Sequence, residues 1–226
     1  MSYRASAKSM LMVTVAFLVL SVVATAMVVL VDVQPIGQMG TTVGLASLND
    51  AVWKALGANA LCDKLSDVVL VLSLLLVVAF GVLGVVQLVQ RKSLAKVDRT
   101  LWLLLALYVV MLVAYVGCDL VAVNYAPQLD AGQLKPSFPS SHVMCVVAVA
   151  VSSAIAVPHL FADERLSKVA TALAVILVVV VLVTRMASGA HWCSDILCGA
   201  FYGFTMAFAF GAACNYFPAK SGRHAR

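Results

Sequence analysis

Four ionisable residues stand in a part of the sequence that is otherwise almost entirely apolar. Arg185, His191 and Asp195 follow the pattern Arg-x5-His-x3-Asp, and His142 ends the segment Phe138–His142 about forty residues earlier. Charged groups in apolar segments are costly, and inside a membrane they are functional suspects by default. Because so few such residues occur here, we expect these four to share one site.

These residue types predict phosphoryl chemistry. A neutral imidazole can attack phosphorus when a carboxylate fixes its tautomer, so His191 is the candidate nucleophile and Asp195 the candidate partner of its second ring nitrogen. His142, on another element, can protonate the leaving oxygen as a general acid. The guanidinium of Arg185 can hold two phosphoryl oxygens in a bidentate manner.

A second anion-binding feature is expected next to His142. The amides and hydroxyls of Ser140 and Ser141 stand at the start of a predicted helix, where anions bind favourably. A metal site made of two His and one Asp is the alternative. No His-x3-His or Cys-x-x-Cys pair supports it, and Arg185 would oppose a cation. We therefore expect phosphate binding, with no metal and no cofactor.

The composition indicates which solvent surrounds this chain. Of its 226 residues, 63% are hydrophobic and 11% are charged, whereas soluble domains have roughly 45–50% apolar and about 25% charged residues. An integral membrane protein is predicted. Six apolar runs, each near the ~20 residues that a spanning helix needs, predict an all-α bundle of six transmembrane helices in a single domain, residues 1–226. The predicted spans are Met10–Val31, Val68–Val89, Leu101–Val123, Val143–Leu160, Leu166–Val183 and Ile196–Phe217.

Lys and Arg are divided unequally between the two sides of this bundle, and basic loops tend to remain cytoplasmic. Four of the fifteen lie on the side of the motif loops: Lys54, Lys64, Lys135 and Arg185. The other eleven lie on the opposite side: Arg4, Lys8, Arg91, Lys92, Lys96, Arg99, Arg165, Lys168, Lys220, Arg223 and Arg226. We therefore expect both termini in the cytoplasm and the motif loops on the outer face of the cytoplasmic membrane. The net charge of +5 then needs no nucleic-acid partner.

The segment Asp32–Asp67 is the only long loop in this plan. Apolar residues recur in it at near-helical spacing between Val43 and Leu61, and Trp53 has an amphipathic ring suited to the headgroup level. We expect an interfacial helix between the first and second spans. It would either help to admit a lipid substrate or merely pack over the bundle.

The last predicted span has a face made of small residues. They follow Asp195 at steps of four: Gly199, Gly203, Ala207 and Gly211. Positions four apart share one helix face, and small residues there let helix backbones approach closely in lipid. The row predicts tight packing of this span and directs Asp195 towards the protein interior.

The six cysteines do not define a disulfide framework. Four of them lie in apolar runs, where a free Cys behaves as a small hydrophobe. Cys62 and Cys193 lie in or near outward segments, so a bridge between them is open without being indicated.

At these residues the chain resembles the type 2 phosphatidic acid phosphatase family, membrane relatives of the vanadium haloperoxidases. The family's third motif, Ser-Arg-x5-His-x3-Asp, is matched by residues 184–195, with Thr184 replacing the leading Ser. Its second motif, Pro-Ser-Gly-His, is matched by residues 139–142, with Ser141 replacing Gly. The resemblance implies a metal-independent phosphatase with a phosphohistidine intermediate on His191. It also implies lipid phosphates or diphosphates as substrates, among them phosphatidic acid, phosphatidylglycerol phosphate and undecaprenyl diphosphate.

The family's first motif, Lys-x6-Arg-Pro, is where the chain departs. One register puts Asp119 and Ala126 at the positions of the Lys and the Arg, and a second register puts Lys135 at the position of the Arg. We hypothesise that Lys135 joins Arg185 in a reduced phosphate clamp.

Two functions from different classes follow. The set of His142, Arg185, His191 and Asp195 favours a phosphatase that acts on a lipid phosphate or diphosphate at the outer face. The missing first motif favours the alternative, a catalytically weak or inactive relative that binds lipid phosphates or is associated with their transport.

Overall fold

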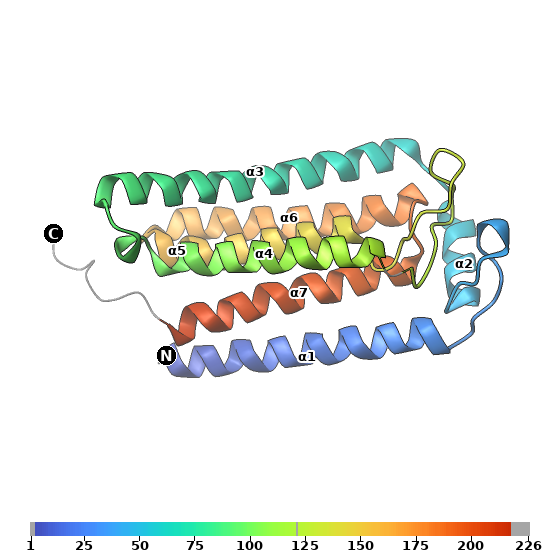
Figure 1. The fold of residues 1–226 in the computed structure, drawn as a ribbon, viewed down its shortest axis with the longest axis horizontal. Helices are drawn as coiled ribbons and strands as arrows, with labels where there is room; N and C mark the ends of the chain where they lie inside the picture. The colour runs from blue at the N-terminus through green and yellow to red at the C-terminus, as the bar shows by residue number, and fades with distance from the viewer. Residues whose placement is uncertain (1–2, 121, 218–226) are drawn as a thin grey trace.

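The structure is a computed structural model in which residues 3–120 and 122–217 are described. Six of its helices are long and apolar enough to cross a membrane, and α2 is the short exception. This confirms the all-α fold with six candidate spans (Figure 1). In chain order the elements are α1 (Tyr3–Leu30), η1 (Gln38–Gly40), α2 (Ala46–Leu56), α3 (Ala60–Arg91), η2 (Leu94–Lys96), α4 (Arg99–Leu120), α5 (Ser141–Leu160), α6 (Glu164–Ser188) and α7 (Cys193–Tyr216).

Several helices extend beyond the apolar runs. The helix α3 begins at Ala60 instead of Val68, because the side chain of Asn59 accepts hydrogen bonds from two backbone amides of its first turn. The helix α6 continues to Ser188, so Arg185 lies in its last turn instead of beyond a span ending at Val183. The predicted loop from residue 32 to 67 is therefore shorter than expected, and residues 122–140 belong to a second long connection.

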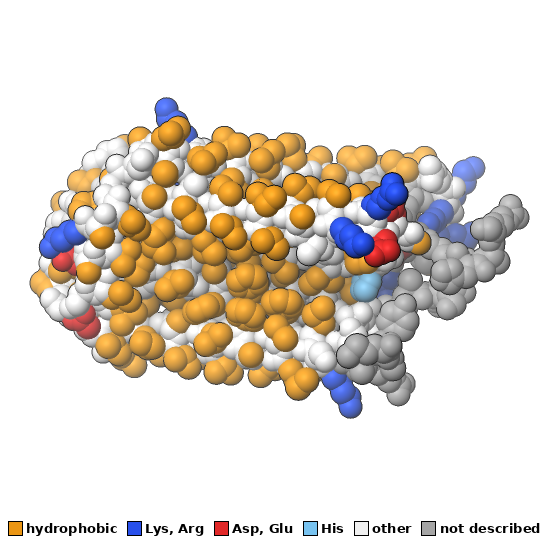
Figure 2. Space-filling model, turned by 180° about the vertical axis from the view of Figure 1, so that it is seen from behind, with side chains coloured by type: hydrophobic (Ala, Val, Ile, Leu, Met, Phe, Trp, Pro, Cys, Tyr) orange, Lys and Arg blue, Asp and Glu red, His pale blue; other side chains and the backbone are white. Residues whose placement is uncertain are grey.

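The long helices lie side by side, and their connections alternate between the two ends of the bundle (Figure 1). One end holds the start of α1 and the end of α7, and we call it the N-terminal end. The other holds α2 and the connections 122–140 and 189–192, and we call it the α2 end. Figure 2 shows that apolar side chains cover the middle of one face, whereas Lys and Arg gather near the ends. The predicted basic residues Lys220, Arg223 and Arg226 lie outside the described residues.

The helix α5 is the centre of the bundle, in contact with α3, α4, α6 and α7. The small-residue face of α7 packs against it. A Cβ atom added at Gly199 would lie 2.5 Å from the carbonyl oxygen of Ser140, and one at Gly203 would lie 2.8 Å from that of Met144. The tight packing predicted for this row is confirmed.

The helix α2 lies across the end of the bundle and contacts α7 (Figure 1). Its Asn49 side chain is fully buried, accepts from the amide of Ser194 at 3.1 Å and donates to the Ser194 hydroxyl at 2.9 Å. Trp53 donates through Nε1 to the carbonyl oxygen of Gly189 at 3.3 Å. These contacts mean that α2 packs over the bundle and holds the connection between α6 and α7. Cys62 and Cys193 are both free thiols, so the bridge left open above is not formed.

Candidate active site

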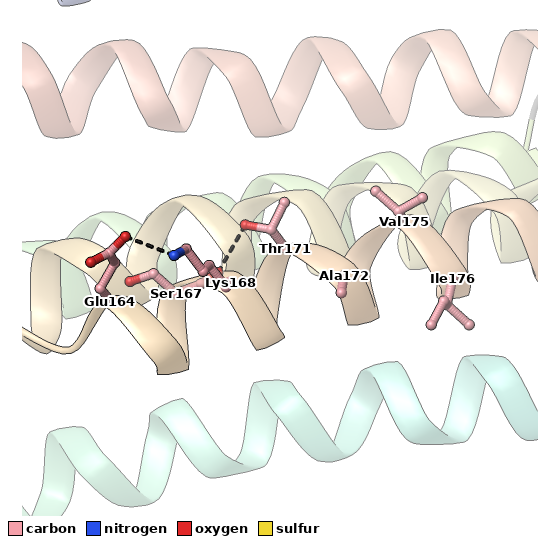
Figure 3. A pocket seen from close by; sticks show the side chains of 7 residues that line it. All are labelled: Glu164, Ser167, Lys168, Thr171, Ala172, Val175 and Ile176. Atoms are coloured by element: carbon pink, nitrogen blue, oxygen red, sulfur yellow. Dashed lines mark hydrogen bonds and ion pairs between the residues drawn. The ribbon is translucent and has the colours of Figure 1, made fainter.

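Two pockets have very different surroundings. One, of about 630 Å³, lies on the outside of α6 near the N-terminal end (Figure 3). Its lining comes from a single helix, Glu164 to Ile176, and its charged residues Glu164 and Lys168 pair with each other at 2.8 Å. The second pocket, of about 170 Å³, lies at the α2 end and is lined from α4, α5, α6 and two connections. The second pocket therefore has what a binding or catalytic site requires, namely ionisable side chains that several elements bring together.

Five of the seven residues predicted for the site line this second pocket, which we call the site cavity. They are Lys135, Ser141, His142, Arg185 and His191. The other two, Ser140 and Asp195, are completely buried next to its lining residues. The structure thus brings the two motifs together, although they are about forty residues apart in the chain.

His191 lies in the connection between α6 and α7. Its Nδ1 is 2.9 Å from the backbone carbonyl oxygen of Ser137. Because a carbonyl oxygen only accepts, Nδ1 bears the proton, and Nε2 has the lone pair that can attack phosphorus. Burial, followed by the positive charge of Arg185 and by His142, lowers the pKa of His191 to about 3. The imidazole is therefore neutral near pH 7, as a nucleophile must be.

The predicted hydrogen bond between Asp195 and His191 was wrong. One carboxylate oxygen of Asp195 accepts from Asn124 Nδ2 at 2.9 Å, and the other accepts from the Ser137 hydroxyl at 2.8 Å and the Trp192 amide at 3.3 Å. The physical reason is that α7 begins at Cys193, so the helical spacing of four does not apply to His191. Asp195 instead fixes Ser137, whose carbonyl orients the imidazole.

Asn124 and Ser137 are site residues that the sequence reasoning missed. The connection 122–140 folds back on itself, because the Ala126 amide donates to Lys135 O and the Ser137 amide donates to Asn124 O, both at 2.9 Å. This pairing sets the Asn124 and Ser137 side chains, both buried, on the two oxygens of Asp195. The feature of the sequence that could have indicated them is a polar residue on each of the two arms of this connection.

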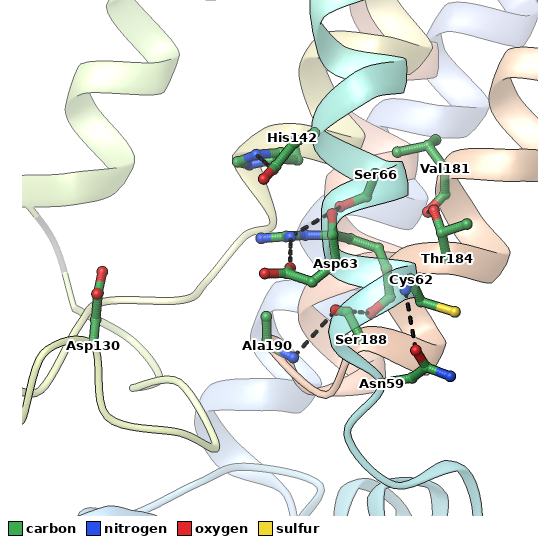
Figure 4. A network of polar contacts seen from close by, with 12 residues as sticks. Asn59, Cys62, Asp63, Ser66, Asp130, His142, Val181, Thr184, Ser188 and Ala190 are labelled. Carbon is green, nitrogen blue, oxygen red and sulfur yellow. Dashed lines mark hydrogen bonds and ion pairs between the residues drawn. The ribbon is translucent and has the colours of Figure 1, made fainter.

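Arg185 is held by the first turns of α3. Its Nη1 lies 2.6 Å from Asp63 Oδ1 and 3.1 Å from Ser66 Oγ. Figure 4 shows Asp63 and Ser66 on α3, with their hydrogen bonds drawn as dashed lines. The guanidinium is buried, and its Nε has no hydrogen-bond partner in the described part of the chain. A buried donor without a partner is unfavourable. An anion in the adjoining cavity can satisfy it.

A second carboxylate from α3 contacts the other motif. Asp67 Oδ1 lies 3.1 Å from Nε2 of His142. Asp63, Ser66 and Asp67 are spaced so that they share one helix face. The sequence analysis missed all three because the predicted span began at Val68. Their spacing of three and four positions was the feature of the sequence that could have indicated a polar helix face.

The predicted anion site at the start of α5 forms only in part. The amide of Ser140 donates to the backbone oxygen of Asp195 at 2.9 Å, so it is not available to a phosphate. The Ser140 hydroxyl is buried and has no partner among the described residues, whereas Ser141 lines the cavity. Ser140 therefore joins α5 to α7, and Ser141 is the better phosphate ligand.

In the two registers considered for the first motif, Lys135 is the one basic residue. It lines the site cavity, with its side chain 62% exposed and its Nζ 3.1 Å from Asp130. Ala126 is buried, and the side chain of Asp119 lies outside the described residues. Across residues 3–120 and 122–217, no three or more His, Cys, Asp or Glu side chains are grouped to hold a metal ion.

The fold and the cavity define a six-span helical protein with two histidines and an arginine at one end of the bundle. The model of the PAP2 superfamily matches residues 73–218, more than half of the chain, and the chain belongs to this superfamily. The structure is similar to that of the first transmembrane PAP2 type phosphatidylglycerolphosphate phosphatase from Bacillus subtilis. The TM-score is 0.57, and the two are 20% identical over 87% of this chain and 93% of that one. A search of curated proteins found no match. Family membership supports a membrane lipid phosphatase.

Proposed function

We propose that this protein hydrolyses lipid phosphates at the outer face of the cytoplasmic membrane through a phosphohistidine on His191. The observation that supports this most is the meeting of His191, His142 and Arg185 at one cavity, with His191 neutral and its Nε2 unprotonated. Nucleophile, general acid and phosphate ligand are the groups that phosphoryl transfer through a covalent intermediate requires.

Each residue has a distinct role in this proposal. His191 attacks phosphorus, and His142 protonates the leaving oxygen. Arg185, with its partnerless Nε, and Ser141 bind the phosphoryl oxygens, and Lys135 contributes a second positive charge. Asp195 acts through Ser137 and is a positioning residue. Ser140 supports the same wall of the cavity, and no metal or cofactor takes part.

The substrate is a lipid because the cavity lies at the end of six candidate spans, where a headgroup can reach it. The candidates are phosphatidic acid, phosphatidylglycerol phosphate and undecaprenyl diphosphate. The B. subtilis protein of similar fold is described as a phosphatidylglycerolphosphate phosphatase, which supports a phosphate on a glycerolipid.

Release of inorganic phosphate by the purified protein tests this function. A panel of these three lipids is offered in detergent micelles, with and without EDTA. We expect release that persists in EDTA, is inhibited by vanadate as a mimic of five-coordinate phosphorus, and is lost in His191→Ala. Strong dependence on added Mg²⁺ would contradict the metal-independent mechanism.

The outer-face location has its own test. Single cysteines at Gln133 and Ser93, in a background without the native ones, lie at the α2 end and in the connection between α3 and α4. An impermeant thiol reagent should label Gln133→Cys from outside intact cells and Ser93→Cys only after lysis. Labelling of both from one side would refute the six-span orientation.

One observation favours the alternative of a non-hydrolytic lipid-phosphate-binding relative. The carboxylate of Asp63 already occupies Nη1 of Arg185, where a phosphate would bind. This alternative predicts saturable binding of phosphatidic acid with no phosphate release in the same panel. Release that depends on His191 would exclude it.

A further inference from the structure

The two carboxylates of α3 have no part in the mechanism above. Asp63 contacts Arg185, and Asp67 contacts His142, with one helical turn between them. Asp67 is 59% exposed, whereas the side chain of His142 is 23% exposed. Solvent therefore reaches the carboxylate, whereas most of the imidazole that it contacts is buried. The main effect of Asp67 is expected on the proton that this imidazole carries.

The contact determines which nitrogen of His142 can deliver a proton. A carboxylate only accepts, so Nε2 of His142 donates to Asp67. The other ring nitrogen, Nδ1, is then the one that loses and regains a proton during turnover. The negative charge of Asp67 also stabilises the imidazolium form, which is the acid.

A supported general acid matters for some phosphate esters and not for others. The leaving group of a lipid monoester is an alkoxide, which is a strong base and needs a proton as the P–O bond breaks. The leaving group of a lipid diphosphate is a phosphate ester, whose second pKa is only about 6. It departs without protonation.

The charges around the cavity favour the same class of substrate. Each cation has a carboxylate partner, in the pairs Arg185–Asp63, His142–Asp67 and Lys135–Asp130. The cavity therefore offers little surplus positive charge. A diphosphate, which has more negative charge than a monoester, is compensated less well there.

We propose that Asp67 is a positioning residue that holds His142 as the general acid, and that the site therefore selects phosphate monoesters of lipid alcohols over lipid diphosphates. This inference rests on the proposed function. In the first step Nε2 of His191 bonds to phosphorus, the bond from phosphorus to the alkoxide oxygen breaks, and that oxygen takes the proton of His142.

The second step returns the enzyme to its starting state. Water attacks the phosphohistidine, and His142 takes one proton from that water. The P–N bond breaks, its electron pair returns to Nε2 of His191, and inorganic phosphate leaves. In both steps Asp67 accepts from Nε2 of His142, and its charge complements that of His142 whenever His142 is protonated.

The test compares leaving groups in Asp67→Asn and in a matched variant, Asp63→Asn, one turn away. The substrates are short-chain phosphatidic acid, p-nitrophenyl phosphate with its good leaving group, and farnesyl diphosphate. We expect the wild type to show a kcat/KM at least about tenfold higher for phosphatidic acid than for farnesyl diphosphate. Asp67→Asn should lower kcat for phosphatidic acid about tenfold or more and that for p-nitrophenyl phosphate less than about threefold. Asp63→Asn should change kcat/KM by a similar factor for all three.

The outcomes separate this inference from the function on which it rests. Asp67→Glu keeps the carboxylate and should retain more activity on phosphatidic acid than Asp67→Asn. An equal effect of Asp67→Asn on good and poor leaving groups, with an unchanged unfolding temperature, would mean a structural role and overturn the inference. So would a wild-type preference for farnesyl diphosphate, while the proposed function would stand. Absence of phosphate release from every substrate would overturn the proposed function, and the inference with it.

Discussion

The two ends of the bundle contain similar residues in different settings. At the α2 end, Asp195 is fully buried and accepts hydrogen bonds from the connections 122–140 and 189–192, and His191 faces a cavity lined from several elements. At the N-terminal end, Asp163 caps α6. Lys168 and Glu164 pair with each other there, and their own side chains are 74% and 83% exposed. Among the described residues, His159 is the histidine at that end, in the last turn of α5.

The convergence of buried polar groups from several elements, and not charge alone, distinguishes the site from the rest of the molecule. Ion pairs of exposed residues contribute about 0–1 kcal/mol and are screened by salt, so the pair of Glu164 and Lys168 does not mark a site. Buried polar groups are unfavourable unless every partner is present. Their gathering from three helices and two connections at the α2 end is therefore the unusual feature, and equivalent substitutions at the two ends should have unequal effects.

The largest contrast is expected between the two histidines. His191→Ala removes the proposed nucleophile, so kcat should fall at least about 1,000-fold. His159→Ala, at the opposite end, should leave kcat and KM for phosphatidic acid within about twofold. Steady-state phosphate release measures both. Comparable losses in the two variants would remove the distinction between the ends.

Next come the two aspartates. In Asp195→Asn one of the two acceptor oxygens becomes an amide nitrogen, which cannot accept from Asn124 Nδ2 at one position or from the Trp192 amide at the other. One buried donor then loses its acceptor, which loosens the connection that holds Ser137 and, with it, the orientation of His191. We expect kcat to fall about 100-fold, or about 2.7 kcal/mol, with a lower unfolding temperature.

Asp163→Asn is the matched control at the N-terminal end. Asn and Asp are similar N-cap residues, so α6 should keep its cap and the free energy of unfolding should change by less than about 0.5 kcal/mol. A fully active Asp195→Asn would show that Ser137 orients His191 without help from Asp195.

The third effect is the dependence of stability on pH. The pKa of His191 is lowered to about 3 in the folded chain, whereas an unfolded His has a pKa near 6.5. Between these values the unfolded state binds more protons, so stability is fully present above about pH 6.5 and is lost as the pH falls towards 3. From pH 6.5 to 5 the loss is at most about 2 kcal/mol.

Thermal unfolding of His191→Gln measures this contribution. The variant keeps a donor for the carbonyl of Ser137 but does not titrate, so its unfolding temperature should fall less than that of the wild type between pH 7 and 5. Parallel pH curves for the two proteins would mean that His191 is already solvated in the folded state.

The sequence predicted those parts of the fold and site that depend on local pattern. Apolar runs of spanning length gave the six candidate spans, and a row of small residues gave the packing face of α7, since each is a property of a single helix. The motif spacing also placed His142, Arg185 and His191 together.

The missed contacts depend on how elements meet. Asp63 and Asp67 belong to α3 only because Asn59 caps that helix early, and hydrophobicity alone cannot locate such a boundary. Asn124 and Ser137 reach Asp195 across 71 and 58 positions of chain. Contacts between distant parts of the chain leave no periodic pattern in the sequence. The expected pairing of His191 with Asp195 failed because His191 lies outside α7.

The smallest contrast is expected between two lysines that each pair with a carboxylate. Lys135 lies 3.1 Å from Asp130 and lines the site cavity, whereas Lys168 lies 2.8 Å from Glu164 on the outside of α6. A phosphoryl group held by Arg185 alone is less well compensated in the transition state than one near two cations. Lys135→Ala should therefore lower kcat/KM about tenfold, or about 1.4 kcal/mol, and Lys168→Ala should leave it unchanged.

A positive charge introduced at position 126 tests whether the effect of Lys135→Ala is electrostatic. Ala126 is buried, and its amide donates to the carbonyl oxygen of Lys135, so the two residues lie side by side. Ala126→Arg in the Lys135→Ala background should recover part of the lost kcat/KM if the loss is electrostatic, because it places a positive charge on the residue that pairs with position 135. The recovery should shrink at high salt, since exposed charges are screened. Wild-type kinetics in Lys135→Ala at both low and saturating substrate would instead leave Arg185 as the sole basic phosphate ligand, and the exposed lysines of the two ends would then be equivalent.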